Sequence, residues 1–132
     1  MILQILDTHA LVHDALNPGE LSATAAQAIE EGDAKGNLAI SDITLWEIGM
    51  LIATRRLQVD SELLPFLKAL LLARSVRVLP ITPEISSISQ TPEWKHGDPA
   101  DRIIAATAVH HRATLLTKDP AIRSFAEVKA IW

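Results

Sequence analysis

The sequence predicts an α/β protein in which helices cover both faces of a parallel sheet. Short apolar segments typical of buried strands alternate with helical segments, and right-handed crossovers turn that order into a parallel sheet. In addition, 48% of the 132 residues are hydrophobic but only 4% are aromatic. The core must therefore consist mainly of Ile, Leu, Val and Ala, which suits parallel strands buried on both sides.

Five segments are expected to be strands because they are short, apolar and bounded by turn or helix signals. The first lies at the start of the chain and ends at Asp7. The third alternates apolar and polar residues. The expected strands are residues 2–6, 38–40, 76–81, 114–117 and 128–131.

Caps and helix breakers mark the helices between these strands. An Asn-Pro-Gly sequence ends the first helix. Ser22 is expected to cap the second, Ala-rich helix, which runs to about residue 31 and is closed by Gly32 and Gly36. Either Asp60 or Ser61 is expected to cap the fourth. The expected helices are residues 8–16, 22–31, 43–56, 62–74, 83–89 and 99–111, with a loop at 91–97 and a helical turn from Pro120.

Composition and charge exclude several classes of protein. The chain has no Cys, which excludes disulfides and thiol chemistry and fits a cytoplasmic setting. Lys68 interrupts the best apolar stretch, and no basic segment precedes an apolar run at the N-terminus. We therefore expect one soluble domain over residues 1–132. The net charge of −4 argues against a nucleic-acid coat protein, but not against a nuclease whose acids hold cations.

Acidic residues gather where such a fold places its ligands. In open parallel sheets, ligands bind beyond the carboxyl ends of the strands. Asp7 follows the first expected strand and Asp119 follows the fourth. Asp98 and Asp101 open the helix before the fourth strand, and Glu47 lies one turn into the helix after the second. All five are expected near one edge of the sheet.

Glu47 is the most informative of these acids. Its helical neighbours are Ile43, Met50 and Leu51, so its carboxylate is expected to be buried or nearly so. A buried charge needs a cation or a strong donor. The alternative is that Glu47 faces solvent along a helix seam or pairs with an Arg.

The other acids also have a structural interpretation. Asp98 can cap the helix that begins at Pro99, with Asp101 in its first turn. Asp7 and Asp119 can likewise cap the segments that follow them. Helix caps need not lie at the same edge of the sheet. The expected convergence of these acids at one edge therefore favours a functional site over capping alone.

The chemistry that suits such a cluster is phosphodiester hydrolysis. Mg²⁺ and Mn²⁺ prefer carboxylate and water oxygens and can activate a water molecule. Thr8 and Thr117 could hydrogen-bond the carboxylates. Lys118 or Arg102 could contact phosphate, although surface ion pairing is equally compatible with their positions.

Four segments of the sequence, taken together, carry a likeness to a known family. They are LDTHALVH (6–13), SDITLWEIGM (41–50), GDPADRIIAATA (97–108) and LLTKD (115–119). They resemble the PIN-domain family and, more narrowly, the VapC-type toxins of bacterial toxin–antitoxin pairs. The resemblance implies a three-layer α/β/α sandwich with a five-stranded parallel sheet. It also implies Mg²⁺- or Mn²⁺-dependent endoribonuclease activity, a homodimer, and inhibition by a cognate antitoxin protein near the active site.

The resemblance also implies roles for individual residues. The metal-binding and catalytic acids would be Asp7, Glu47, Asp101 and Asp119. Asp98 falls in the D-P-x-D-R pattern and would be an auxiliary acid or a cap. Thr117 matches the hydroxyl residue of the T-x-D motif.

Several other residues could be either sites or structural groups. His9 and His13, four residues apart, could bind zinc together with Asp7, but such pairs often face solvent. Trp46, Trp94 and Trp132 are expected to be packing groups, with Trp94 the candidate for substrate or partner contact. The apolar stripe of the fourth helix is expected to pack in the core, or else to form a dimer or antitoxin surface. It comprises Leu63, Leu64, Phe66, Leu67, Leu70 and Leu71.

Two other functions share some of these features. A non-catalytic regulatory module with an acidic pocket would carry an Asp at the end of the third strand, where this chain has none. A structure-specific DNA nuclease would use the same acids, but such enzymes usually need extra elements to grip a duplex. RNA cleavage is the preferred hypothesis.

Overall fold

A computed structural model describes residues 1–95 and 97–132 of the chain. It contains a five-stranded sheet in which every neighbouring pair of strands is parallel, in the order β3-β2-β1-β4-β5. The strands are β1 (Gln4–Leu6), β2 (Leu38–Ser41), β3 (Arg77–Leu79), β4 (Thr114–Leu116) and β5 (Lys129–Ile131). The prediction of a five-stranded parallel sheet is confirmed.

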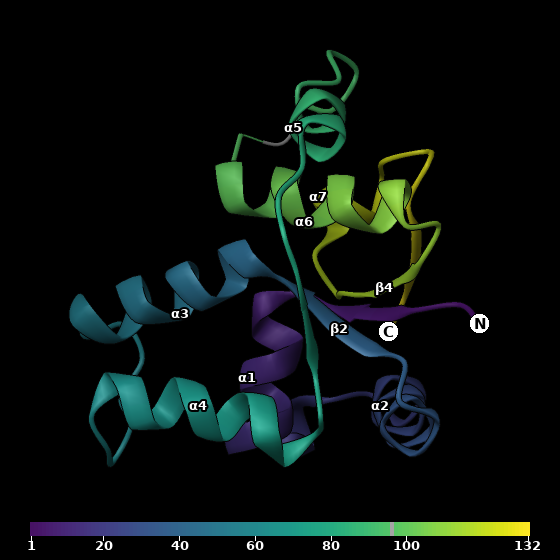
Figure 1. The fold of residues 1–132 in the computed structure, drawn as a ribbon. Coiled ribbons are helices and arrows are strands. Elements are labelled where there is room, and N and C mark those ends of the chain that lie inside the picture. The colour runs from purple at the N-terminus through teal and green to yellow at the C-terminus, as the bar shows by residue number, and fades with distance from the viewer. Residues whose placement is uncertain (96) are drawn as a thin grey trace.

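Helices connect the strands and cover both faces of the sheet (Figure 1). They are α1 (Thr8–Leu16), the short 3₁₀ helix η1 (Pro18–Glu20), α2 (Ala23–Lys35), α3 (Asp42–Ala53), α4 (Leu63–Ala73), α5 (Pro83–Ser89), α6 (Pro99–His110) and α7 (Pro120–Arg123). No helix in the described part of the chain is long and apolar enough to cross a bilayer.

The two faces of the sheet bury two separate cores because successive strand residues point to opposite sides. Ile5 and Leu115 pack with α5, α6 and α7 on one face. Their neighbours Leu6 and Leu116 pack with α1, α2 and α4 on the other face. All four side chains are fully buried. The molecule is therefore a three-layer α/β/α sandwich, as predicted.

The order of the strands reverses at β1. From β1 the chain moves outward through β2 to β3, and it then returns to place β4 on the other side of β1. The carboxyl ends of β1 and β4 consequently lie beside each other, where Leu6 pairs with Leu116. Such a reversal point is where open α/β sheets bind ligands.

Helix α2 continues beyond the predicted end. Gly32 does not close the helix but lies inside it, where an added Cβ would come within 2.5 Å of the Leu38 side chain. The glycine therefore allows α2 to approach β2 closely. The helix ends instead at Gly36, whose φ of 69° is left-handed and favours glycine.

Several other predicted boundaries were wrong. The third strand covers only Arg77–Leu79, since Pro80 has no N–H to donate to the sheet. The first strand begins at Gln4, and Ile2 lies 61% exposed. Helix α4 is preceded by Glu62, which makes no side-chain capping bond, so neither Asp60 nor Ser61 is its cap.

Helix α4 buries only part of its apolar stripe. Within the stripe, Leu70 is buried and Leu64 is 61% exposed; Leu72, which lies outside the stripe, is 80% exposed. At the end of this helix, Arg74 forms ion pairs with Asp14, Glu30 and Asp33 at 3.1, 2.8 and 3.3 Å. These ion pairs connect the end of α4 to α1 and α2.

Candidate active site

Asp7 is a buried carboxylate at the carboxyl end of β1. Its side chain is the N-cap of α1, and its Oδ1 accepts a hydrogen bond from the Ala10 N–H at 2.7 Å. The residue is only 4% exposed. Burial raises the pKa of Asp7 above its ordinary value, and the charge of the nearby Asp119 raises it further. Hydrogen bonds from Thr117 and Ala10 lower the pKa of Asp7, and so does the charge interaction with His9.

Asp119 follows β4 and lies close enough to Asp7 to affect its pKa. Its Oδ1 accepts a hydrogen bond from the Ala121 N–H at 2.8 Å, and it caps α7. Thr117 links the two acids, because its hydroxyl is hydrogen-bonded to Asp7 and also accepts the Asp119 N–H at 3.1 Å. Asp7, His9, Lys118 and Asp119 line a shared cavity of about 340 Å³.

A second group of acids forms where α3 meets the start of α6. Glu47, Asp98 and Asp101 each place one carboxylate oxygen so that the three oxygens lie within 4.8 Å of one another. In the described residues, Asp7 and Asp119 are not members of this group. The structure thus arranges the five predicted acids as a group of three and a pair.

Glu47 is half-buried as a residue, but its Oε1 atom is buried, as expected for its carboxylate. This atom has no hydrogen-bond partner in the part of the chain that the structure describes. A buried carboxylate oxygen without a donor is costly. Together with two further carboxylates beside it, this atom is suited to bind a divalent cation.

Asp98 combines the two roles considered for it. Its Oδ1 accepts the Asp101 N–H at 3.1 Å, which makes it the N-cap of α6. The same carboxyl group belongs to the cluster with Glu47. Capping therefore positions Asp98 at the cluster.

The auxiliary residues have different surroundings. The hydroxyl of Thr8 is hydrogen-bonded to Thr44 at 3.2 Å, which ties α1 to α3. The guanidinium of Arg102 donates to the carbonyl oxygens of Ser89, Trp94 and Thr91 at 2.8, 2.6 and 3.1 Å. Arg102 therefore holds residues 89–94 against α6, and we do not assign it a phosphate contact.

Trp94 and Trp132 pack against the cores as predicted, whereas Trp46 does not. Trp94 is 4% exposed and stacks on Phe125 with ring centroids 4.5 Å apart, so it is not available for substrate or partner contact. Trp46, predicted to be a packing group, is 62% exposed. It lines a cavity of about 430 Å³ with Glu47 and Asp98. The rings of His9 and His13 lie 6.3 Å apart, and neither residue belongs to the ligand cluster found among the described residues.

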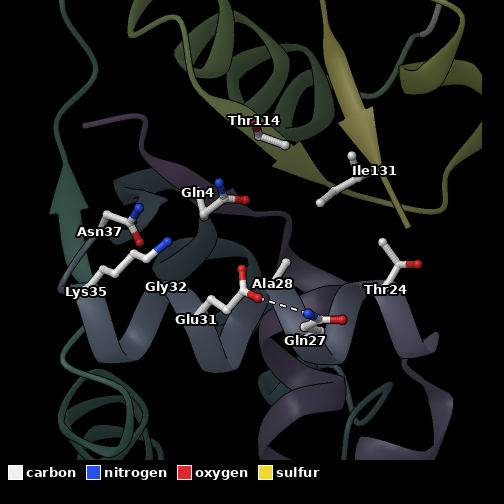
Figure 2. Close-up of a pocket in the computed structure, with 10 residues that line it drawn as sticks. All are labelled: Gln4, Thr24, Gln27, Ala28, Glu31, Gly32, Lys35, Asn37, Thr114 and Ile131. Carbon is white, nitrogen blue, oxygen red and sulfur yellow. Dashed lines mark hydrogen bonds between the residues drawn. The ribbon is translucent and has the colours of Figure 1, made fainter.

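Another cavity lies at the opposite edge of the sheet (Figure 2). It has a volume of about 350 Å³ and lies between α2 and the amino ends of β1 and β4. Its acid, Glu31, accepts a hydrogen bond from Gln27 at 2.9 Å. Because ligands of open α/β sheets bind at the carboxyl ends of the strands, the carboxylate edge is the candidate active site.

Comparisons with known proteins show the family of the chain. The model of the PIN domain family matches residues 5–128. The chain is 38% identical over 125 residues to Ribonuclease VapC22 of Mycobacterium tuberculosis, covering 94% of this chain and 92% of that protein.

Solved structures share the fold at lower sequence identity. VapBC2 from Rickettsia felis, bound to a DNA fragment from its promoter, superposes with a TM-score of 0.72 at 19% identity, covering 98% of each chain. DNA-bound VapBC from Salmonella typhimurium gives a TM-score of 0.70 at 17% identity, covering 99% of this chain and 98% of that one. FitAcB from Neisseria gonorrhoeae gives 0.69 at 23% identity, with 98% and 97% coverage.

Proposed function

This chain belongs to the PIN domain family, and on that premise we propose that it is a metal-dependent endoribonuclease. The observation that carries the proposal is the cluster of Glu47, Asp98 and Asp101 where α3 meets the start of α6. The Asp7–Asp119 pair at the ends of β1 and β4 adds two further carboxylates. The similarity to a protein named a ribonuclease supports RNA as the substrate. The reaction would be hydrolysis of a phosphodiester bond.

Asp7, Glu47, Asp101 and Asp119 would hold Mg²⁺ or Mn²⁺, with Asp98 as an auxiliary acid. The donor set fits such an ion because it consists of carboxylates and includes the unpartnered Oε1 of Glu47. When bound, the cation supplies an activated water and neutralises charge on the phosphate.

The chain's own residues prepare this site. Thr117 and the Ala10 N–H hold the Asp7 carboxylate by hydrogen bonds that favour its charged form. Asp98 fixes the first turn of α6 and so positions Asp101. Ser41 accepts the Ile43 N–H at 3.2 Å, which starts α3 at the end of β2.

We further propose that the enzyme is the toxin of a toxin–antitoxin pair. Support comes from its similarity to VapC22 and from the fold it shares with VapBC proteins and with a toxin-antitoxin complex from Klebsiella pneumoniae. On the same likeness we propose a cognate antitoxin protein as partner, a homodimer and a cytoplasmic location. The chain would be co-expressed with a candidate antitoxin protein and purified. Elution of both chains together would support the pairing, and separate elution would contradict it.

The test of the activity is cleavage of a mixed single-stranded RNA by the purified chain in Mg²⁺, Mn²⁺ or EDTA. Glu47→Gln removes the charge of a proposed ligand, and Glu31→Gln is the matched control at the opposite edge. We expect cleavage that needs the metal, is lost in Glu47→Gln and persists in Glu31→Gln. A parallel reaction with double-stranded DNA tests the DNA-nuclease alternative. A folded chain, free of antitoxin, that cuts no RNA would contradict the proposal.

A further inference from the structure

We propose that Trp46 is a stacking platform for the unpaired nucleobase next to the phosphodiester that the enzyme cuts. This inference rests on the proposed ribonuclease function and adds to it the residue that receives a base. It concerns the cavity beside the acid cluster, whose lining is largely apolar.

One face of α3 forms the first wall of this cavity. Ile43, Trp46, Glu47 and Met50 are spaced at i, i+3, i+4 and i+7 and therefore share one side of the helix. The opposite wall consists of the first residues of α6, from Asp98 to Ala100. An apolar strip and two of the clustered carboxylates thus lie in a single cavity.

Trp46 is open to solvent in this chain. The residue is 62% exposed, whereas Trp94 is 4% exposed, stacks on Phe125 and donates its indole N–H to Glu127 at 3.2 Å. A large exposed aromatic group beside a polar cluster is typical of a binding surface. Trp46 therefore has the surroundings of a ligand-contacting residue.

The position of the cavity favours a nucleobase as the occupant. A phosphate held through a cation at Glu47 and Asp98 would bring its attached nucleoside to the same walls. The cavity volume of about 430 Å³ lies in the range of ligand pockets, roughly 300–1,000 Å³. Unpaired RNA bases are commonly bound by stacking on aromatic side chains. A base in a duplex is already stacked, so the site favours single-stranded RNA.

The experiment measures kcat/KM for a short single-stranded RNA and for the same RNA with one abasic nucleotide beside the cut. Wild type, Trp46→Ala, Trp46→Phe and the control Leu72→Ala, which truncates another exposed apolar side chain, are compared. Circular dichroism verifies that each variant is folded, and gel filtration measures its oligomeric state.

We expect Trp46→Ala to lower kcat/KM on the intact RNA about tenfold, mainly through KM, which is the size of one base–aromatic stack. The abasic RNA should be cut equally by wild type and Trp46→Ala, since neither complex contains the stack. Trp46→Phe should retain most of the activity on the intact RNA, and Leu72→Ala all of it.

The outcomes separate the two proposals. The stacking role is wrong if wild type cuts the intact and the abasic RNA with the same kcat/KM. It is also wrong if the abasic nucleotide lowers kcat/KM for Trp46→Ala. In both cases the ribonuclease proposal stands. If Trp46→Ala changes only the oligomeric state, the indole contacts a second copy instead. If wild type cuts no RNA while folded, both proposals fail.

Discussion

The hydroxyl of Thr117, directly after β4, is hydrogen-bonded to the carboxylate of Asp7, directly after β1. The two residues are far apart in sequence and are brought together by the pairing of β1 with β4. This hydrogen bond lowers the pKa of Asp7 against the larger opposing effect of burial. Thr117 is therefore a positioning residue that favours the charged form of a proposed metal ligand.

Replacing Thr117 by Val should raise the pKa of Asp7, because it removes a hydrogen bond to the ionised carboxylate. A higher pKa means that a higher pH is needed to ionise Asp7. We expect the acidic limb of the pH–rate profile to move to higher pH by about one pH unit. Thr117→Ser keeps the hydroxyl and should retain the wild-type profile; an unshifted profile in Thr117→Val would contradict the assignment.

Asp7→Asn should stabilise the metal-free protein at neutral pH. Burial raises the pKa of Asp7 in the folded chain. A carboxyl group with a raised pKa stabilises the fold only while it is protonated, so this stabilisation is lost as the pH rises through the folded-state pKa. The ionised side chain therefore lowers the free energy of unfolding at pH 7, while Asn caps a helix as well as Asp does.

Thermal unfolding in EDTA checks this expectation. The Tm of Asp7→Asn should exceed that of wild type at pH 7, and the difference should vanish below about pH 4, where Asp is protonated in the unfolded chain as well. Asp60→Asn, at an exposed position, is the control. A lower Tm for Asp7→Asn at pH 7 would show that the charge stabilises the fold.

Asp98→Asn separates the capping role of Asp98 from its proposed role in metal binding. The amide still accepts the Asp101 N–H, so stability without metal should be unchanged. The rise in Tm that Mg²⁺ or Mn²⁺ causes by binding the folded state should become smaller, because one carboxylate of the cluster is lost.

Two further variants control this experiment. Asp98→Ala removes the cap as well and should lower the free energy of unfolding by about 1 kcal/mol. Ser22→Ala removes the cap of α2, where the Ser22 hydroxyl accepts the Ala25 N–H at 3.0 Å, and should leave the metal-induced shift intact. An unchanged metal response in Asp98→Asn would make Asp98 a cap only.

Arg102→Lys should lower stability, although it keeps the charge. The three carbonyl oxygens that the guanidinium contacts cannot all be reached by one ammonium group. We expect a loss of about 2 kcal/mol in urea unfolding. Arg56→Lys, at an exposed position after α3, should be neutral. Unchanged stability with a raised KM for RNA would instead favour a phosphate contact.

Local patterns predicted most of the helices and the alternation of strands and helices along the chain. The bounds of α1 and α5 agree with the predicted ranges, since a helix-breaking sequence ends α1, and Thr82, with Pro83 after it, starts α5. The end of α2 could not be predicted in this way. Gly32 has the features of a stop signal, but it is retained inside the helix because the Leu38 side chain of β2 leaves no room for a Cβ.

Trp46 shows the same limit for the candidate site. Its spacing from Ile43, Glu47 and Met50 was visible in the sequence, yet that pattern indicates only a shared helix face. Whether the face is covered depends on neighbouring helices. The start of α6 meets it at Asp98, Pro99 and Ala100 and leaves the indole of Trp46 exposed.

By itself, the sequence determined that this is a parallel α/β protein with acids after its first and fourth strands, because strand ends and helix caps are set by residues close together in the chain. Only the tertiary structure decided which acids meet. The packing of α3 on α6 brings Glu47 to Asp98 and Asp101, and the pairing of β1 with β4 brings Asp7 to Thr117 and Asp119. Contacts between residues distant in sequence depend on how whole elements pack, which no local pattern specifies.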